Sequence, residues 1–222
     1  MKKKSQKDIF LEYEGNNYFQ RNKEIVYAAE KDMVIRVLRD YSIKPSNVLE
    51  VGCNTGYRLA GIFDLFDDVK VCGIEPSTEA IKTGTSKYPF IDFTTGTADD
   101  MNSFRTGSFD LVIVGFVLYV VDREILLKVI AETDRVLANG GILMMIDFFC
   151  NIPSKNPYKH ISEFEAFAYK QNYEDIFLST KLYHLIDKRA MNHITKEYDS
   201  TDDYHNKYAL STLRKDINAG YR

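Results

Sequence analysis

The chain has 222 residues, a formal net charge of −3 and a sequence pI near 5.9, and 45% of its residues are hydrophobic. This length and apolar content predict one folded domain and exclude a disordered chain. The acidic balance has the wrong sign for a dedicated nucleic-acid binder. The longest nearly unbroken apolar run, Leu111 to Val121, is far shorter than the stretch of about 20 residues that spans a bilayer. Neither a nucleic acid nor a membrane is therefore the expected partner, and the oligomeric state stays open.

The cysteines and histidines argue against a metal centre. Cys53, Cys72 and Cys150 show no CxxC spacing, which disfavours zinc and thioredoxin-like sites. The histidines beyond residue 180 lie too far apart along the chain to suggest a ligand set. Three free thiols, and a basic N-terminus that no apolar stretch follows, lead us to expect a cytoplasmic protein without a metal.

Helical patterns and short apolar runs alternate along the first two thirds of the chain. Helices are predicted where apolar residues recur every three or four positions, over residues 23–41, 56–66, 77–87 and 123–138. Strands are predicted over the apolar runs 47–51, 69–74, 90–93, 109–115 and 141–147. Several of these runs are apolar throughout, as in strands that are buried on both faces of a parallel sheet. The alternation predicts a doubly wound α/β fold.

The last third of the chain has a different pattern. Residues 151–160 are polar and contain proline, which predicts a loop. A helix is predicted over 161–180, followed by two more strands over 182–187 and 208–214.

A short loop with two glycines joins the strand predicted over 47–51 to the helix that follows it. The loop closes the run VLEVGCNTG, and ligands of open α/β sheets bind at the carboxyl ends of the strands. Gly52 permits a tight turn, and Gly56 permits a close approach to a ligand. Asn54 and Tyr57 stand where a dinucleotide fingerprint needs glycine, and no Gly-Lys-Ser/Thr follows. Both kinds of phosphate site are therefore disfavoured, and for Cys53 we expect a backbone role.

The run E-x-G-C-N-T-G resembles motif I of the class I S-adenosylmethionine-dependent methyltransferases, with Asn54 at the usual middle glycine. The resemblance implies that Glu50 attracts the cationic methionine part of the cofactor. It also implies that Glu75, at the end of the next strand, takes both ribose hydroxyls, because a carboxylate accepts two donors well. Ala98 and Asp99 match the positions that read adenine through a backbone N–H and a side-chain acceptor.

The resemblance covers about residues 47–148 and includes the strand at 109–115 and the stretch that follows it. It implies S-adenosylmethionine as the cofactor. The residues that it implies for cofactor binding are Glu50, Gly52, Cys53, Asn54, Gly56, Glu75, Pro76, Ala98, Asp99, Gly115 and Phe116.

The N-terminal segment is similar, on a weaker pattern, to methyltransferases associated with bacterial surface-sugar biosynthesis. Residues 13–22 read YEGNNYFQRN. Tyr18 could cover the cofactor, and Arg21 could bind a carboxylate with two parallel hydrogen bonds. A helix that packs on the core is the alternative interpretation of the same segment.

Three residues are candidates for chemistry on the acceptor. His160 follows the strand predicted over 141–147 and could take a proton from an attacking hydroxyl, or could be an exposed loop histidine. Asp147, at the end of that strand, could be a base or could cap the following loop. Tyr119 stands where many family members carry a histidine that lines the methionine part.

Together these observations predict a single domain over residues 1–222, with a helical cap (1–44), a cofactor-binding core (45–150) and a substrate side (151–222). The fold expected is Rossmann-like, with a seven-stranded, mostly parallel sheet and an antiparallel last strand. The predicted function is methyl transfer from S-adenosylmethionine to a polar small molecule, with a sugar or nucleotide-sugar intermediate as one possibility. The alternatives are a catalytically silent cofactor-binding module and, on weaker grounds, an NAD-dependent oxidoreductase.

Overall fold

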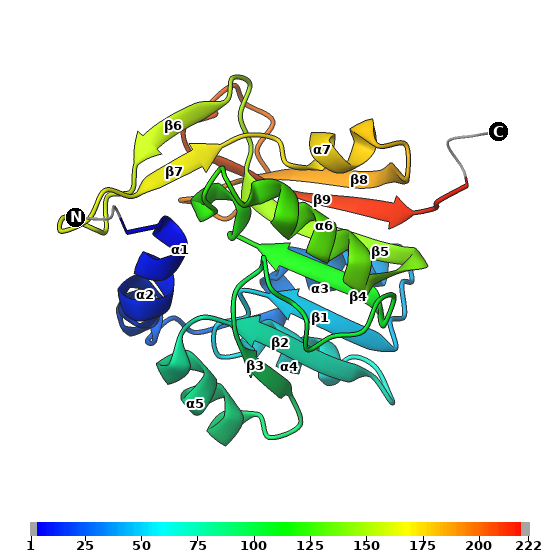
Figure 1. Ribbon diagram of the computed structural model, residues 1–222. Helices are drawn as coiled ribbons and strands as arrows, with labels where there is room; N and C mark the ends of the chain where they lie inside the picture. The colour runs from blue at the N-terminus through cyan, green and yellow to red at the C-terminus, as the bar shows by residue number, and fades with distance from the viewer. Residues whose placement is uncertain (1–3, 219–222) are drawn as a thin grey trace.

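The computed structural model describes residues 4–218, and its centre is a seven-stranded sheet in the order β3-β2-β1-β4-β5-β9-β8 (Figure 1). The five strands from β3 to β5 are parallel to their neighbours, and β9 runs antiparallel to both β5 and β8. This confirms the predicted Rossmann-like sheet with one antiparallel strand. Its strands are Asn47–Val51 (β1), Lys70–Glu75 (β2), Asp92–Thr95 (β3), Phe109–Gly115 (β4), Leu137–Phe148 (β5), Tyr183–Asn192 (β8) and Lys207–Lys215 (β9).

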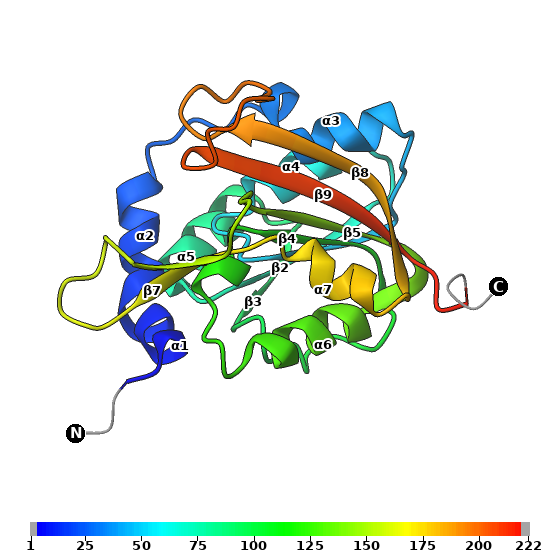
Figure 2. The ribbon, with the colours of Figure 1, turned by 90° about the horizontal axis from the view of Figure 1, so that it is seen from above.

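Helices cover both faces of the sheet, and Figure 2 shows them on opposite sides of it. One face packs against α3 and α4 and the other against α6 and α7, so alternate residues of a central strand serve different cores. In β4, Leu111 and Ile113 face the first core, whereas Val112 and Val114 face the second. All four are buried, which explains the unbroken apolar run. The helices are Met33–Asp40 (α3), Tyr57–Phe63 (α4), Thr78–Lys87 (α5), Leu126–Val136 (α6) and Glu174–Ser179 (α7), with short 3₁₀ turns at Ala29–Lys31 (η2) and Leu118–Val120 (η3).

The first helical segment lies across the carboxyl ends of the central strands (Figure 1). It consists of Gln6–Ile9 (α1), a π-helical turn at Phe10–Glu14 (η1) and Gly15–Asn22 (α2). We call residues 6–22 the lid. The side chain of Gln6 is buried and fastens the lid, because it donates to the carbonyls of Val120 and Phe167 and accepts from the Phe167 N–H at 2.8 Å.

A second, two-stranded sheet lies beside the lid. Ser154–Pro157 (β6) pairs with Phe167–Lys170 (β7) in an antiparallel hairpin, which we call the strap. The predictions of a loop over 151–160 and a helix over 161–180 were therefore wrong in part. Residues 167–170 pair with β6 as a strand and do not form a helix. Lys155 of β6 covers the ring of Phe167 on β7, with its Nζ 3.6 Å from the ring centroid. Within the predicted helix 161–180, only α7 (Glu174–Ser179) is helical.

Other differences concern element boundaries. The helix predicted over 23–41 begins only at Met33, because the side chain of Asp32 accepts from the N–H groups of Val34 and Ile35 and fixes the N-terminus there. The strand predicted over 90–93 is Asp92–Thr95, where pairing with β2 sets the register. Among residues 4–218, no helix is long and apolar enough to cross a membrane.

Candidate active site

A cavity of about 1170 Å³, its mouth included, lies between the lid and the carboxyl ends of β1, β2 and β4. The strand ends and the loops after them provide its floor, and Phe10 and Tyr18 of the lid line the opposite side. The structure brings most of the predicted site residues into this one cavity. Those that line it are Tyr18, Glu50, Gly52, Asn54, Glu75, Pro76, Ala98, Asp99, Gly115, Phe116 and Tyr119.

Glu50 carries a buried oxygen without a partner in this cavity. Its Oε1 accepts from Nη1 of Arg58, and Nε of the same guanidinium donates to Asp32 at 2.9 Å. Its Oε2 is buried and has no hydrogen-bond partner in the described structure. Burial raises the pKa of Glu50 to about 7, although the neighbouring Arg58 lowers it. The free oxygen is therefore suited to a cationic donor on a ligand.

The loop after β1 borders the cavity, and three of its residues have a positive φ. Gly52 has φ +72°, and a Cβ at this position would lie 2.5 Å from a methyl group of Val117. Asn54 is also left-handed, with φ 52°, and its side chain accepts from the Thr55 N–H at 2.7 Å. Gly56 has φ +78° at the start of α4. The close approach of backbone to cavity thus depends on Gly52.

Glu75 lies at the end of β2 and is held by the loops on either side of it. Its Oε2 accepts from the Asn54 N–H and its Oε1 from the Ser77 N–H, each at 2.9 Å. Burial raises the pKa of Glu75, and the two backbone hydrogen bonds oppose the rise. Each oxygen keeps a second lone pair, so the carboxylate can still accept from two adjacent hydroxyl groups.

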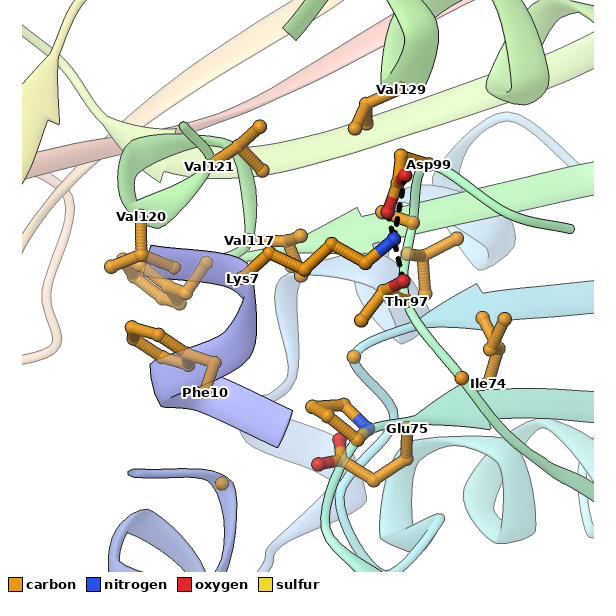
Figure 3. Close-up of a pocket in the computed structure, with 18 of the residues that line it drawn as sticks. Lys7, Phe10, Ile74, Glu75, Thr97, Asp99, Val117, Val120, Val121 and Val129 are labelled. Atoms are coloured by element: carbon orange, nitrogen blue, oxygen red, sulfur yellow. Dashed lines mark hydrogen bonds and ion pairs between the residues drawn. The ribbon is translucent and has the colours of Figure 1, made fainter. Parts of the chain in front are cut away.

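Asp99 lines the cavity and is bound by two lysines. Lys7 reaches from α1 across the cavity, and its Nζ lies 2.8 Å from Oδ2 of Asp99 (Figure 3). Lys128 contacts the same oxygen at 3.2 Å, and the Thr97 hydroxyl donates to the other at 2.8 Å. Burial raises the pKa of Asp99, but these three hydrogen bonds outweigh it and hold the pKa below its usual value.

Aromatic side chains form the other end of the cavity. Phe116, with φ 53°, and Tyr119 follow β4, and their rings lie 6.4 Å apart. Tyr158, at the end of β6, contacts the rings of Phe10 and Tyr119 at 5.6 and 6.4 Å. Its side chain is buried and lines the cavity as well. This end therefore combines flat apolar surfaces with phenolic hydroxyl groups.

Five of the residues predicted from the sequence do not line the cavity. Cys53 points into the core beside Gly73, and Gly56 packs against Ile91 and Phe93. Arg21 forms an ion pair with Glu14 of the lid. His160 is exposed, although its ring lies 5.4 Å from that of Tyr158.

Asp147 is the fifth of these residues and faces the backbone. Its carboxylate accepts from the N–H groups of Phe148 at 2.8 Å and Tyr119 at 3.2 Å. Burial raises its pKa to about 7. It borders a second, small cavity that Tyr173 and Lys188 also line. In this position Asp147 holds the chain after β4 in place.

Three further residues that the sequence analysis did not select lie at this site. Arg58 links Glu50 to Asp32, Lys7 binds Asp99, and Glu14 accepts from Tyr158. Arg58 follows Gly56 by two residues, and this position in the first turn of α4 was a signal that could have identified it. Lys7 and Glu14 had no such signal, because they reach the site only through the docking of the lid. Within residues 4–218, no cluster of three or more His, Cys, Asp or Glu side chains could hold a metal ion.

Comparisons with known proteins agree with this geometry. A family model described as "Methyltransferase domain" matches residues 49–145. A ubiquinone/menaquinone biosynthesis C-methyltransferase of Campylobacter jejuni is 24% identical over 141 residues, which are 59% of this chain and 58% of the relative. The chain thus spans less than two thirds of the length of such relatives. A carboxy-S-adenosyl-L-methionine synthase of Campylobacter fetus is 21% identical over 187 residues, 82% of this chain and 76% of that protein.

Among solved structures, a 1,6-didemethyltoxoflavin-N1-methyltransferase of Burkholderia thailandensis, with bound 1,6-didemethyltoxoflavin and S-adenosylhomocysteine, has the same fold. The TM-score is 0.68 at 12% identity, over 90% of this chain and 84% of that one. Residues 49–145 thus match the methyltransferase family model, and the fold is that of a class I S-adenosylmethionine-dependent methyltransferase. S-adenosylmethionine is its cofactor.

Proposed function

We propose that the chain transfers the methyl group of S-adenosylmethionine to a polar small molecule, for which a sugar or nucleotide-sugar intermediate is one candidate. The observation that carries the proposal is the unpartnered Oε2 of Glu50, buried in the cavity beside the loop that contains Gly52. A cofactor with an ammonium group satisfies this oxygen, whereas a pyrophosphate would be repelled by it.

The residues around the cavity suit the other parts of this cofactor. Glu75 has a free lone pair on each oxygen for the two ribose hydroxyls. The backbone of Ala98 and the carboxylate of Asp99 would meet the adenine, and Pro76 and Gly115 also line the cavity. Gly52, Asn54 and Gly56 shape the loop, and Cys53 supports it from the core.

When bound, the cofactor supplies a methyl group that its sulfonium already activates. The chain's own residues then have two tasks: to align the acceptor with that methyl group and to exclude water. The lid excludes water, because Lys7, Phe10 and Tyr18 line the cavity on the side opposite the strand ends. The aromatic end formed by Phe116 and Tyr119 aligns the acceptor.

We further propose that the chain divides into a cap over residues 1–44, a cofactor-binding core over 45–150 and a substrate side over 151–222. All three cysteines are free, which fits a reducing compartment, and we place the protein in the cytoplasm on this ground.

Two experiments test the proposed function. Calorimetric titration with S-adenosylhomocysteine and with NAD separates the methyltransferase from an oxidoreductase: we expect saturable binding of the first and none of the second. Incubation with methyl-labelled S-adenosylmethionine and a panel of hydroxylated and amino small molecules then separates an enzyme from a silent binding module. Binding without transfer to any acceptor would favour the silent module, and tight binding of NAD alone would overturn the proposal.

A further inference from the structure

The lid contains a carboxylate that is completely enclosed. Glu14 closes the π-helical turn, and its side chain has no exposed surface. Its Oε1 accepts from the Tyr158 hydroxyl at 2.9 Å, and Arg21 donates to both of its oxygens. Arg21 thus compensates the buried charge and fixes the orientation of the carboxylate. The contact joins the lid to the strap, 144 positions apart in the chain.

This contact decides what Tyr158 can offer to a ligand. A phenol has one proton, and here that proton points to Glu14. Only lone pairs of the Tyr158 oxygen then remain, for the neighbouring Tyr119 hydroxyl or for a group in the cavity that Tyr158 lines. Aromatic surfaces lie nearby, since Tyr158 contacts the rings of Phe10 and Tyr119, and Phe116 packs on Tyr119. The site therefore favours a molecule with a flat apolar face and a hydroxyl group that donates.

We propose that Tyr158, oriented by Glu14, binds the hydroxyl group of the methyl acceptor and takes its proton during transfer. The proposal rests on the proposed function and names the acceptor as a hydroxyl compound with a flat apolar face. Both a phenol and a sugar ring stacked on an aromatic wall have this chemistry. Tyr158 is then a catalytic residue, and Glu14 is the residue that positions it.

The proton has a complete route in this arrangement. As the acceptor oxygen forms its bond to the methyl carbon, the carbon–sulfur bond breaks and its electron pair stays on sulfur. The hydroxyl proton passes to the Tyr158 oxygen, while the proton of Tyr158 passes to Oε1 of Glu14. The products are a methyl ether, S-adenosylhomocysteine and a neutral Glu14, which returns its proton to solvent when the lid opens.

Fluorine NMR titrations of the protein saturated with S-adenosylhomocysteine test this inference with simple probes in place of the natural acceptor. The probes are 4-fluorophenol, 4-fluoroanisole, which has a methyl group in place of the donated proton, and 4-deoxy-4-fluoro-D-glucose. We expect at least one hydroxyl probe to bind about tenfold more tightly than 4-fluoroanisole. Whether the phenol or the sugar does so identifies the source of the flat face.

Three variants locate the effect. Tyr158→Phe should abolish the preference for the hydroxyl probe, and Glu14→Gln should reduce it. Tyr13→Phe is the matched control, because Tyr13 is a lid tyrosine that packs on Phe164 and does not line the cavity. It should leave the preference unchanged. Should Glu14→Gln lower the melting temperature strongly, Tyr158→Phe alone still decides, since it removes one oxygen atom and keeps the ring.

Several results would overturn the inference. They are the absence of binding by every probe, the failure of both hydroxyl probes to bind more tightly than 4-fluoroanisole, or a preference that survives Tyr158→Phe. Failure of S-adenosylhomocysteine itself to bind would instead overturn the proposed function, so the two failures are distinguishable.

Discussion

The two ends of the cavity are built in different ways. At the cofactor end, Glu50, Gly52 and Glu75 lie at the ends of adjacent strands, and the sheet alone brings them together. At the acceptor end, the contact between Glu14 and Tyr158 forms only when the lid and the strap dock on the sheet and on each other. We therefore expect the cofactor end to be the more tolerant of changes in the lid, and the acceptor end to depend on it.

The largest effect is expected at the loop after β1. Gly52→Val should abolish cofactor binding, because φ is +72° and the new Cβ would lie 2.5 Å from a methyl group of Val117. Calorimetry with S-adenosylhomocysteine measures the loss, which we expect to exceed about 100-fold. Gly140→Ala is the matched control: Gly140 also has a positive φ but meets nothing within 4 Å of a new Cβ. Unchanged affinity in a folded Gly52→Val protein would contradict the assignment of the loop.

Glu75→Ala should weaken cofactor binding by about 1.5–3 kcal/mol, since hydrogen bonds to a charged group are lost. The loss includes the support that Glu75 gives to the N–H groups of Asn54 and Ser77. Glu79, an exposed acid on α5, provides the control variant Glu79→Ala, which should leave the affinity unchanged. A loss of a few tenths of a kcal/mol in Glu75→Ala would mean that another acid holds the ribose.

The affinity for S-adenosylhomocysteine should also depend on pH through Glu50. Burial raises the pKa of Glu50 to about 7. The ammonium group that we propose as its partner would bind only the ionised form. Below that pH a proton must be released on binding, so the affinity should fall by a factor approaching about ten per pH unit. Calorimetry between pH 5 and pH 8 measures the slope. Glu50→Gln should bind weakly with a flatter profile, and an unaltered profile in this variant would assign the slope to another group.

The cofactor end was the part of the site that the sequence could predict. The predicted strands at 47–51 and 109–115 coincide with β1 and β4. A strand that is buried on both faces is apolar along most of its length, so its bounds can be recognised in the sequence. Once the strand ends are known, the positions of Glu50 and Glu75 follow from the topology of an open sheet. What escaped prediction is the orientation of side chains. Asp147 also ends a strand, yet its carboxylate turns to the backbone of Tyr119 and Phe148.

The acceptor end had no comparable signal. Glu14 is one of many acids in the sequence, and its burial depends on Arg21 and on a tyrosine far along the chain. The strap was predicted as a loop and a helix, because neither β6 nor β7 alternates between buried and exposed residues: β6 is exposed throughout and β7 is half-buried throughout. Such contacts follow from the packing of whole elements rather than from local sequence.

A smaller effect is expected when the lid is loosened. Gln6→Ala leaves the carbonyls of Val120 and Phe167 without their donor. Amide exchange of residues 6–22 should become faster, while the affinity for S-adenosylhomocysteine falls by only about three- to tenfold, because the sheet holds most of that ligand. Gln20→Ala, on the exposed side of the same lid, should change neither. A loss of cofactor affinity as large as that of Glu75→Ala would show that the two ends are not independent.

The smallest effect is expected at His160, where the sequence suggested a general base. His160 is exposed and lies outside the cavity lining, whereas Tyr158, two residues earlier, is buried and lines the cavity. A base must reach the proton that it removes, either directly or through one water molecule. We therefore expect His160→Ala to change the turnover of an acceptor found in the panel by less than about twofold, and Tyr158→Phe to lower it by about 10² or more. The affinity for S-adenosylhomocysteine, measured on the same samples, should be the same in both variants. If His160→Ala lowered turnover 100-fold with cofactor affinity intact and Tyr158→Phe did not, the proton would leave through the loop after β6 rather than through the lid, and the acceptor end would be open to solvent where we infer that it is closed.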